Sequence, residues 1–306
     1  MSEIILHHYP LSPFAEKIRR VLAYKRLPWR SVEQPIMAPK PDLTPLTGGY
    51  RRIPVLQIGA DVYCDTALIG RVLQRRHPNP TCLPTALAGA AALIEDWADH
   101  RLFMQTVPPV VVALVDQLPP GFLADRADMT PAFTKEALMA GAPQAHAQAL
   151  ISLDRLEAQL TQTPFILGDA FTLADAACYH PIWFLQHGGD LFAAVRERPA
   201  LARWYERVAG FGPGDSLPMS NADALAIARD ATPVDVTGGC AGSGYATGEQ
   251  VAIVADDYGR EQTVGSVIRA TAEEIVVLRQ DPIAGEVAVH YPRAGYRIER
   301  RPPAAR

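Results

Sequence analysis

The 306-residue chain is 48% hydrophobic and 20% charged, with a net charge of −4, which is an ordinary balance for a chain with a buried core. Its mild acidity offers no general attraction to nucleic-acid phosphates or anionic lipid, so we expect neither as a partner. The first residues lack the basic start and apolar run of a signal peptide, and no apolar stretch is long enough to span a membrane, so we expect a cytoplasmic protein.

From residue 3 to about residue 78 the sequence alternates between strand and helix patterns. "EIILHHY" predicts a strand, "SPFAEKIRRVLAYKRL" a helix with one apolar face, and "SVEQPI" a second strand. "RRIPVLQIG" and "DVYC" predict a hairpin that turns at Gly59-Ala60, and "DTALIGRVLQRR" a helix that ends before Pro78. We expect a first domain over residues 1–78 and a proline-rich link over 77–84.

Residues 85–211 predict an all-helical domain. Its amphipathic segments cover residues 86–105, 131–161, 172–187 and 199–209, and Gly141 and Pro143 are expected to break the second of them. Residues 212–247 are rich in Gly, Pro, Ala and Asp. They predict a linker with one short helix in "NADALAIARD", packed back on the helical domain.

Residues 248–301 return to strand patterns. Five short runs predict a bent sheet or a small SH3-like barrel: "EQVAIVA", "TVGSVIRA", "EIVVLR", "EVAVHY" and "YRIER". A domain of this size is marginal alone, so we expect it to pack on a neighbour. Residues 245–301 contain seven Arg and nine Asp or Glu, which does not suit a nucleic-acid barrel. Structural cover, a dimer contact, shielding of a pocket and recruitment of a partner all stay open.

Ser12 and Pro13 begin the first predicted helix. A serine oxygen accepts an early backbone N–H and proline fits the first helical position, so one interpretation is a plain cap. The other interpretation uses the same geometry, because the amides and dipole of a helix start stabilise an anion and a hydroxyl adds a hydrogen bond to it.

Two further motifs, "RRIPVL" and "CDTALIGRVL", carry the same kind of ambiguity. The Ile53–Pro54 bond is either trans at an ordinary strand entry, or cis, which would turn the backbone groups of Ile53 toward an extended peptide. Asp65 or Thr66 either caps the next helix or forms a second anion site where Asp65 pairs with an ammonium group. A carboxylate and an amine together describe an α-amino-acid headgroup.

In this order the motifs resemble the cytosolic glutathione transferases. "SPFAEKIR", "RRIPVL", "DTALIGRVL", the proline-rich link and "FILGDAFTLADAACYHPIWFL" fall within residues 3–210. Thr172 and Asp175 in the last of these have the spacing of a capping box. The resemblance implies an α+β multidomain fold, with a thioredoxin-like N-terminal domain and an all-helical glutathione-transferase C-terminal domain beside the predicted barrel. The wording "SPFAEK" is similar to the serine-type tau and omega-like groups.

The resemblance implies that glutathione is the cosubstrate. Ser12 then lies at the activating position and stabilises the glutathione thiolate, with Tyr9 as the runner-up. Pro54 is then cis, and the backbone of Ile53 holds the cysteinyl part of glutathione. Asp65 and Thr66 hold its γ-glutamyl headgroup.

Arg51 and Arg52 precede the Ile-Pro pair, and Arg52 occupies the family's basic position. Each arginine either pairs with a glutathione carboxylate or is simply solvated, and the solvated interpretation is preferred here. His7 and His8 have no third ligand in the sequence and point to opposite faces of a strand, so we expect them to be structural. The four cysteines are far apart and form no zinc spacing, so we expect reduced thiols and no metal.

An electrophile pocket is expected between the two domains. Its candidate walls are also compatible with the core, because apolar stripes at helical spacing usually face a helix bundle. They are Leu11, Phe14, Trp97, Arg101, Phe103 and Met104.

The expected function is conjugation of glutathione to a small electrophile by a homodimer. One alternative is a non-catalytic scaffold whose tail recruits a partner. Another is a glutathione-dependent isomerase or dehalogenase that shares the thiolate.

Overall fold

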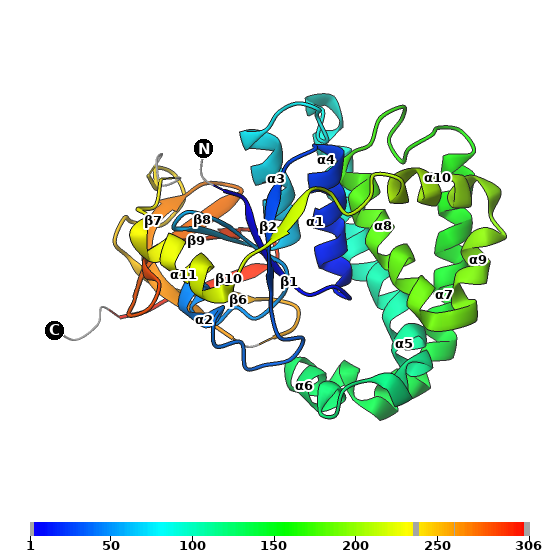
Figure 1. The fold of residues 1–306 in the computed structure, drawn as a ribbon, viewed down its shortest axis with the longest axis horizontal. Helices are drawn as coiled ribbons and strands as arrows, with labels where there is room; N and C mark the ends of the chain where they lie inside the picture. Colours follow the sequence, from blue (N-terminus) through cyan, green and yellow to red (C-terminus); the bar gives the residue numbers. More distant parts are fainter. Residues whose placement is uncertain (1–2, 235–238, 260, 303–306) are drawn as a thin grey trace. The chain divides into compact units, whose positions relative to one another are not determined.

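The computed structural model describes residues 3–234, 239–259 and 261–302. They form two compact units (Figure 1). The first unit takes in the described residues of Met1–Ala15, Pro28–Ile69 and Asp215–Arg306, and the second takes in Glu16–Leu27 and Gly70–Gly214. Helices α1 (Pro13–Tyr24) and α3 (Thr66–Arg76) therefore each contribute residues to both units.

The first unit is built on a ten-stranded sheet with the order β10-β6-β7-β8-β9-β4-β3-β1-β2-β5. Its strands are β1 (Ile5–His8), β2 (Trp29–Glu33), β3 (Val55–Ile58), β4 (Asp61–Cys64), β5 (Ser216–Pro218), β6 (Gln250–Ala255), β7 (Thr263–Ala270), β8 (Glu274–Asp281), β9 (Gly285–Pro292) and β10 (Tyr296–Arg300). The predicted hairpin at Gly59-Ala60 is confirmed, because β3 and β4 pair antiparallel across that turn. A short helix α2 (Thr44–Thr47) also belongs to this unit.

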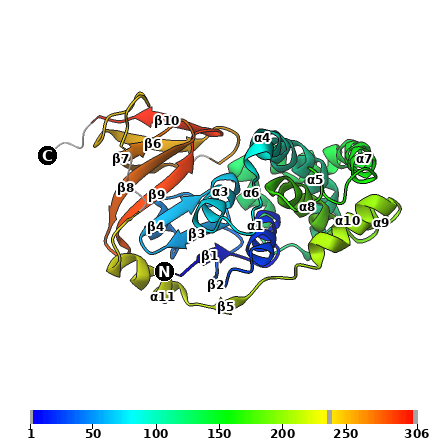
Figure 2. The ribbon, with the colours of Figure 1, turned by 90° about the horizontal axis from the view of Figure 1, so that it is seen from above.

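The C-terminal strands continue the N-terminal sheet (Figure 2). β9 pairs parallel with β4, with Asp61 opposite Ala288 and Tyr63 opposite His290. The buried imidazole of His290 lies 3.1 Å from the carboxylate of Asp61 and 2.8 Å from that of Glu274, and its ring stacks on Tyr63 at 4.3 Å. Hydrogen bonds and packing therefore join the two groups of strands.

The SH3-like barrel is not confirmed. The structure places the five predicted strands in one row, β10-β6-β7-β8-β9, and this row continues into β4. The expectation that this segment packs on a neighbour is confirmed. One buried core holds apolar residues from both parts of the sequence, including Leu43, Leu46, Val55, Val62, Val251, Ile253, Val267, Val277 and Val289.

The linker after the helical segment packs on the sheet, so the prediction that it returns to the helical domain is wrong. β5 pairs parallel with β2, and the backbone N–H of Trp29 donates to the carbonyl of Asp215. The predicted short helix is confirmed as α11 (Asn221–Asp230), and Ala228 of this helix belongs to the core of the sheet. Strand β2 would otherwise be an edge strand with unpaired backbone groups. Pairing with the three residues of β5 satisfies these groups and holds the linker against the sheet.

His7 and His8 both have hydrogen bonds within the first unit. Nε2 of the buried His7 lies 2.8 Å from Oε1 of Gln57, and its Nδ1 lies 3.2 Å from Nε2 of Gln34. Burial lowers the pKa of His7 from 6.5 to about 4, although the bond to Gln57 opposes this shift. His8 bonds to the hydroxyl of Ser31 at 2.8 Å. These contacts give both imidazoles a structural role.

The second unit is helical (Figure 1). Its principal elements are α4 (Ala88–Asp96), a π-helical turn (Trp97–Leu102), α5 (Phe103–Ala113), α6 (Phe122–Met129), α7 (Lys135–Leu160), α8 (Leu173–Leu185), α9 (Ala193–Arg196) and α10 (Pro199–Ala209). The predicted break at Gly141 and Pro143 is wrong, because α7 continues through both residues. Burial of Leu138, Ala149 and Leu153 on the same helix offsets the hydrogen bond that a proline removes.

The predicted capping box at the start of α8 is confirmed. The buried carboxylate of Asp175 accepts the backbone N–H and the hydroxyl of Thr172, each at 2.8 Å. It also accepts the backbone N–H of Ile166 at 2.8 Å and the indole N–H of Trp204 at 2.9 Å. One carboxylate thus joins the start of α8 to the preceding loop and to α10.

Candidate functional site

Strand register brings the three N-terminal motifs to one edge of the sheet. His7 near the end of β1 lies opposite Val55 at the start of β3, and Val55 lies opposite Cys64 at the end of β4. The segments that follow β1, precede β3 and follow β4 therefore leave the sheet at the same edge. Two of them open helices, α1 and α3, whose N-termini favour negative charge.

Ser12 caps α1. Its Oγ accepts the backbone N–H of Ala15 at 3.2 Å, and its own N–H donates to the carbonyl of Tyr9 at 3.1 Å. The residue is only 2% exposed. A hydroxyl offers one donor and two acceptor positions, so a serine that accepts from Ala15 can also donate its O–H to a thiolate.

Residues next to Ser12 differ in their surroundings. The half-buried ring of Tyr9 lies 5.9 Å from the ammonium group of Lys40. Leu11 is 55% exposed and Phe14 is half-buried.

Arg51 and Arg52 are ion-paired within the first unit, so the solvated interpretation of both is wrong. Arg51 pairs with Glu261 at 3.2 Å. The guanidinium of Arg52 binds both carboxylate oxygens of Asp257, one of them at 3.2 Å, and also donates to the carbonyl of Tyr258. Its guanidinium carbon lies 4.1 Å from the centroid of the Tyr258 ring. The partners lie more than 200 residues away along the chain, beyond the reach of local sequence patterns.

The Ile53–Pro54 peptide bond is cis, as the resemblance implies. Pro54 is buried and Ile53 is half-buried, immediately before β3. The pair therefore lies at the edge of the sheet that the register defines.

Asp65 follows β4 with a left-handed φ of 78°. Its Oδ1 accepts the backbone N–H of Ala67 at 2.8 Å, so it caps α3. Its Oδ2 lies 3.1 Å from the hydroxyl of Tyr296, on the last strand. Thr66 is buried at the first position of the helix.

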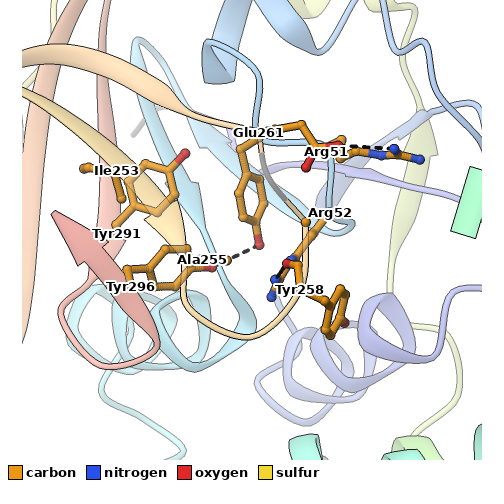
Figure 3. Close-up of a pocket in the computed structure, with 10 residues that line it drawn as sticks. Arg51, Arg52, Ile253, Ala255, Tyr258, Glu261, Tyr291 and Tyr296 are labelled. Atoms are coloured by element: carbon orange, nitrogen blue, oxygen red, sulfur yellow. Dashed lines mark hydrogen bonds and ion pairs between the residues drawn. The ribbon is translucent and has the colours of Figure 1, made fainter. Parts of the chain in front are cut away.

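A small pocket in the first unit is lined by Arg51 and Arg52 together with Tyr50, Tyr291 and Tyr296 (Figure 3). Its volume is about 10 Å³, about what one water molecule needs. The hydroxyls of Tyr50 and Tyr296 are 3.4 Å apart there, and the ring of Tyr291 packs 5.6 Å from that of Tyr50. Burial raises the pKa of all three phenols, which keeps them neutral and able to donate hydrogen bonds. Sequence patterns gave no signal for these tyrosines as part of a site.

The candidate pocket walls from the helical unit lie around its π-helical turn. Half-buried Trp97 and exposed Arg101 belong to this turn, and Met104, 36% exposed, follows it in α5. Phe103 packs against the core cluster that contains Val107, which supports the core interpretation for this residue. π-helical turns interrupt regular helices and are frequent at functional sites.

The helical unit also contains a buried charge cluster that the sequence analysis missed. Lys17 lies 2.6 Å from the carboxylate of Asp99 and 3.3 Å from that of Glu95. Nε2 of the fully buried His180 lies 2.9 Å from Asp99. Burial alone would raise the pKa of Asp99, but Lys17 and His180 outweigh it and lower that pKa. This cluster connects α1, α4, the π-helical turn and α8.

Three of the four cysteines are held as neutral thiols by burial. All four are free, and Cys64, Cys82 and Cys178 are buried. Burial raises the pKa of each of these three, to about 11 for Cys82. Across the described ranges, no group of three or more His, Cys, Asp and Glu side chains is arranged to hold a metal ion. No helix in the described part of the chain is long and apolar enough to cross a bilayer.

Comparisons with known proteins match both units. Residues 6–81 match the glutathione S-transferase N-terminal domain, and residues 139–207 match the glutathione S-transferase C-terminal domain. Glutathione S-transferase 3 from Zea mays is 28% identical over 222 residues, which cover 68% of this chain and 90% of that protein. The beta-etherase LigF from a Sphingobium strain is 15% identical, covers 70% of this chain and 97% of its own, and has a TM-score of 0.56, which shows a shared fold.

A GST-like protein of known crystal structure from Pseudomonas syringae matches along almost the whole chain. It is 39% identical, covers 98% of this chain and 100% of its own, and has a TM-score of 0.80. The similarity therefore includes the C-terminal strands, whereas the Zea mays and Sphingobium proteins cover 68% and 70% of this chain. The chain belongs to the glutathione S-transferase family, with the family's N-terminal and C-terminal domains and an additional group of C-terminal strands.

Proposed function

We propose that the protein is a serine-type glutathione transferase that stabilises the glutathione thiolate and conjugates it to a small electrophile. The observation that carries the proposal is the strand register. It brings the Ser12 cap of α1, the backbone of Ile53 and the Asp65 cap of α3 to one edge of the sheet.

The thiolate step requires only modest stabilisation. A free cysteine thiol has a pKa of about 8.5, and lowering it by about two units takes about 2.7 kcal/mol. The N-terminus of a helix supplies about 0.3–1 kcal/mol and a charge-assisted hydrogen bond about 1.5–3 kcal/mol. Ser12 fits the second contribution, because its buried hydroxyl can donate while its oxygen caps α1, and a buried hydrogen bond is strengthened by the low local dielectric.

The rest of glutathione would use the same edge. The backbone of Ile53 would bind the cysteinyl part, Asp65 and Thr66 the γ-glutamyl headgroup, and Arg52 a carboxylate. Leu11 and Phe14 would contribute to the electrophile site, and the pocket roles expected for Trp97, Arg101 and Met104 stay predictions. By analogy with the cytosolic family, we propose a cytoplasmic homodimer.

The test combines retention on immobilised glutathione with a thiol-conjugation assay on a general electrophile. Wild type should be retained and active, Ser12→Ala should be retained but strongly impaired, and Tyr9→Phe is the matched control that should remain active. Turnover that survives Ser12→Ala but disappears in Tyr9→Phe would transfer the activating role to Tyr9.

A second candidate, a non-catalytic scaffold, is favoured by one observation. Asp65 and Arg52, which would hold glutathione, already have the partners Tyr296 and Asp257 within the chain. Retention without turnover in the wild type would support this candidate. A wild type that is neither retained nor active would refute the transferase function.

A further inference from the structure

Three charged side chains at the proposed thiol site have partners from the C-terminal segment that carries the additional strands, and Figure 3 shows one of these pairs, Arg51 with Glu261. Arg51 pairs with Glu261 and Arg52 pairs with Asp257, two residues that lie between β6 and β7. Asp65 accepts a hydrogen bond from Tyr296 on β10. The two guanidinium groups and the Asp65 carboxylate therefore already have ion-pair or hydrogen-bond partners within the chain.

These partners have the chemistry of the two ends of a peptide thiol. Asp257 presents both carboxylate oxygens to Arg52, as a peptide carboxylate would. Tyr296 donates its O–H to Asp65, in the place where an ammonium group would donate. The pocket of about 10 Å³ that Arg52 and Tyr296 line has room for about one water molecule.

The contacts are held by the fold of the first unit. Tyr296 is 8% exposed, its ring packs 5.2 Å from that of Tyr291, and β10 pairs with β6 over five residues. The hydroxyl of Thr263 on β7 donates to the carbonyl of Thr47, which ties the next strand to the segment before Arg51. Arg52 and Asp257 are 19% and 25% exposed, so their ion pair is partly shielded from solvent. A ligand end that takes these positions has to displace ordered groups.

We propose that Asp257 and Tyr296 are specificity-determining residues that compete with the charged ends of glutathione for Arg52 and Asp65, so that the site binds glutathione less tightly and also admits thiols without those ends. This inference rests on the proposed function, because it concerns the thiol that Ser12 would activate. The additional class is a small neutral thiol that keeps an amide beside the sulfur and lacks the γ-glutamyl headgroup and the terminal carboxylate.

The test measures equilibrium binding of two probes, glutathione and N-acetylcysteamine, by calorimetry on the full chain. Asp257→Asn removes the carboxylate that occupies Arg52, and Tyr296→Phe removes the donor that occupies Asp65. Each should raise the affinity for glutathione about five-fold, which is what loss of a competing ion pair or hydrogen bond of about 1 kcal/mol gives. The affinity for N-acetylcysteamine should not change, because this probe has neither charged end.

Glu249→Gln is the matched control. It breaks an ion pair with Arg300 on the same group of strands but outside the pocket, and it should leave both affinities at the wild-type value. A variant that merely loosens the fold would change the affinities for both probes together, so the ratio of the two affinities carries the result. A thermal melt of each variant checks that it remains folded.

Three outcomes would overturn the inference: a ratio that stays constant, a glutathione affinity that falls in either variant, or a wild type that fails to bind N-acetylcysteamine. A failure of the proposed function looks different. In that case the wild type conjugates neither thiol, or Ser12→Ala conjugates them as fast as the wild type does. The ratio of the two binding affinities would still change in Asp257→Asn and Tyr296→Phe.

Discussion

Replacing Ser12 by alanine removes two interactions that the structure separates. The first is the hydrogen bond from the N–H of Ala15 to Oγ, which caps α1. The second is the O–H that we propose for the thiolate. The cap acts on the stability of the whole protein, whereas the donor acts only on a bound thiol.

The two losses have different expected sizes. Removing a serine cap costs about 1 kcal/mol of the free energy of unfolding. Removing a charge-assisted hydrogen bond of about 1.5–3 kcal/mol should raise the pKa of the bound glutathione thiol by about one to two units. The remaining effect of the helix N-terminus, about 0.3–1 kcal/mol, should leave that pKa slightly below the value of free glutathione.

The assay is a pH titration of the thiolate ultraviolet absorbance with glutathione bound at saturation, together with urea unfolding. Ser12→Thr is the matched control, because it retains both the hydroxyl and the capping oxygen and should titrate close to wild type. If Ser12→Ala loses about 1 kcal/mol of stability but leaves the pKa of the bound thiol unchanged, Ser12 is only a cap and the proposed mechanism is refuted.

Three buried groups give further predictions. Because burial lowers the pKa of His7 from 6.5 to about 4, the unfolded chain binds its proton more tightly, and about 3 kcal/mol of stability should be lost as pH falls through that interval. His7→Gln should reduce this loss. If urea unfolding shows the same pH dependence for wild type and His7→Gln, the loss does not arise from His7. Asp175→Asn leaves an amide to face four donors and should cost about 3 kcal/mol; an unchanged melting temperature would count against this. Lys17→Met leaves the carboxylate of Asp99 without its ammonium partner and should cost about 3–5 kcal/mol in chemical denaturation, and a loss below 1 kcal/mol would show that the cluster relaxes.

Local signals explain what the sequence predicted well. The Ser12 cap, the hairpin at Gly59-Ala60 and the capping box of Thr172 and Asp175 each involve residues only a few positions apart. Such pairs are specified by residue type and spacing, which a single sequence displays directly. The order of the motifs that contain Ser12, Pro54, Asp65 and Asp175 indicates the family that the comparisons show.

Long-range pairing explains what the sequence did not predict. Asp61 and His290 are 229 residues apart, and Arg52 and Asp257 are 205 apart. Periodicity identifies the C-terminal strands but does not indicate which strand they join, so the sequence predicts a bent sheet or small barrel packed on an unspecified neighbour. The same lack of long-range information made Arg52 appear solvated.

The hydroxyl of Tyr296 indicates that the additional strands and the thiol site depend on each other. A phenylalanine would fill the same space beside Tyr50 and Tyr291 without a polar atom, whereas a buried hydroxyl without a partner costs about 1–3 kcal/mol. Its acceptor is Asp65, which directly follows β4, the strand that pairs with β9. The C-terminal strands thus align β4 by backbone pairing and engage the carboxylate at its end by a side chain. Their place in the sheet and their effect on the choice of thiol would therefore arise from the same contacts.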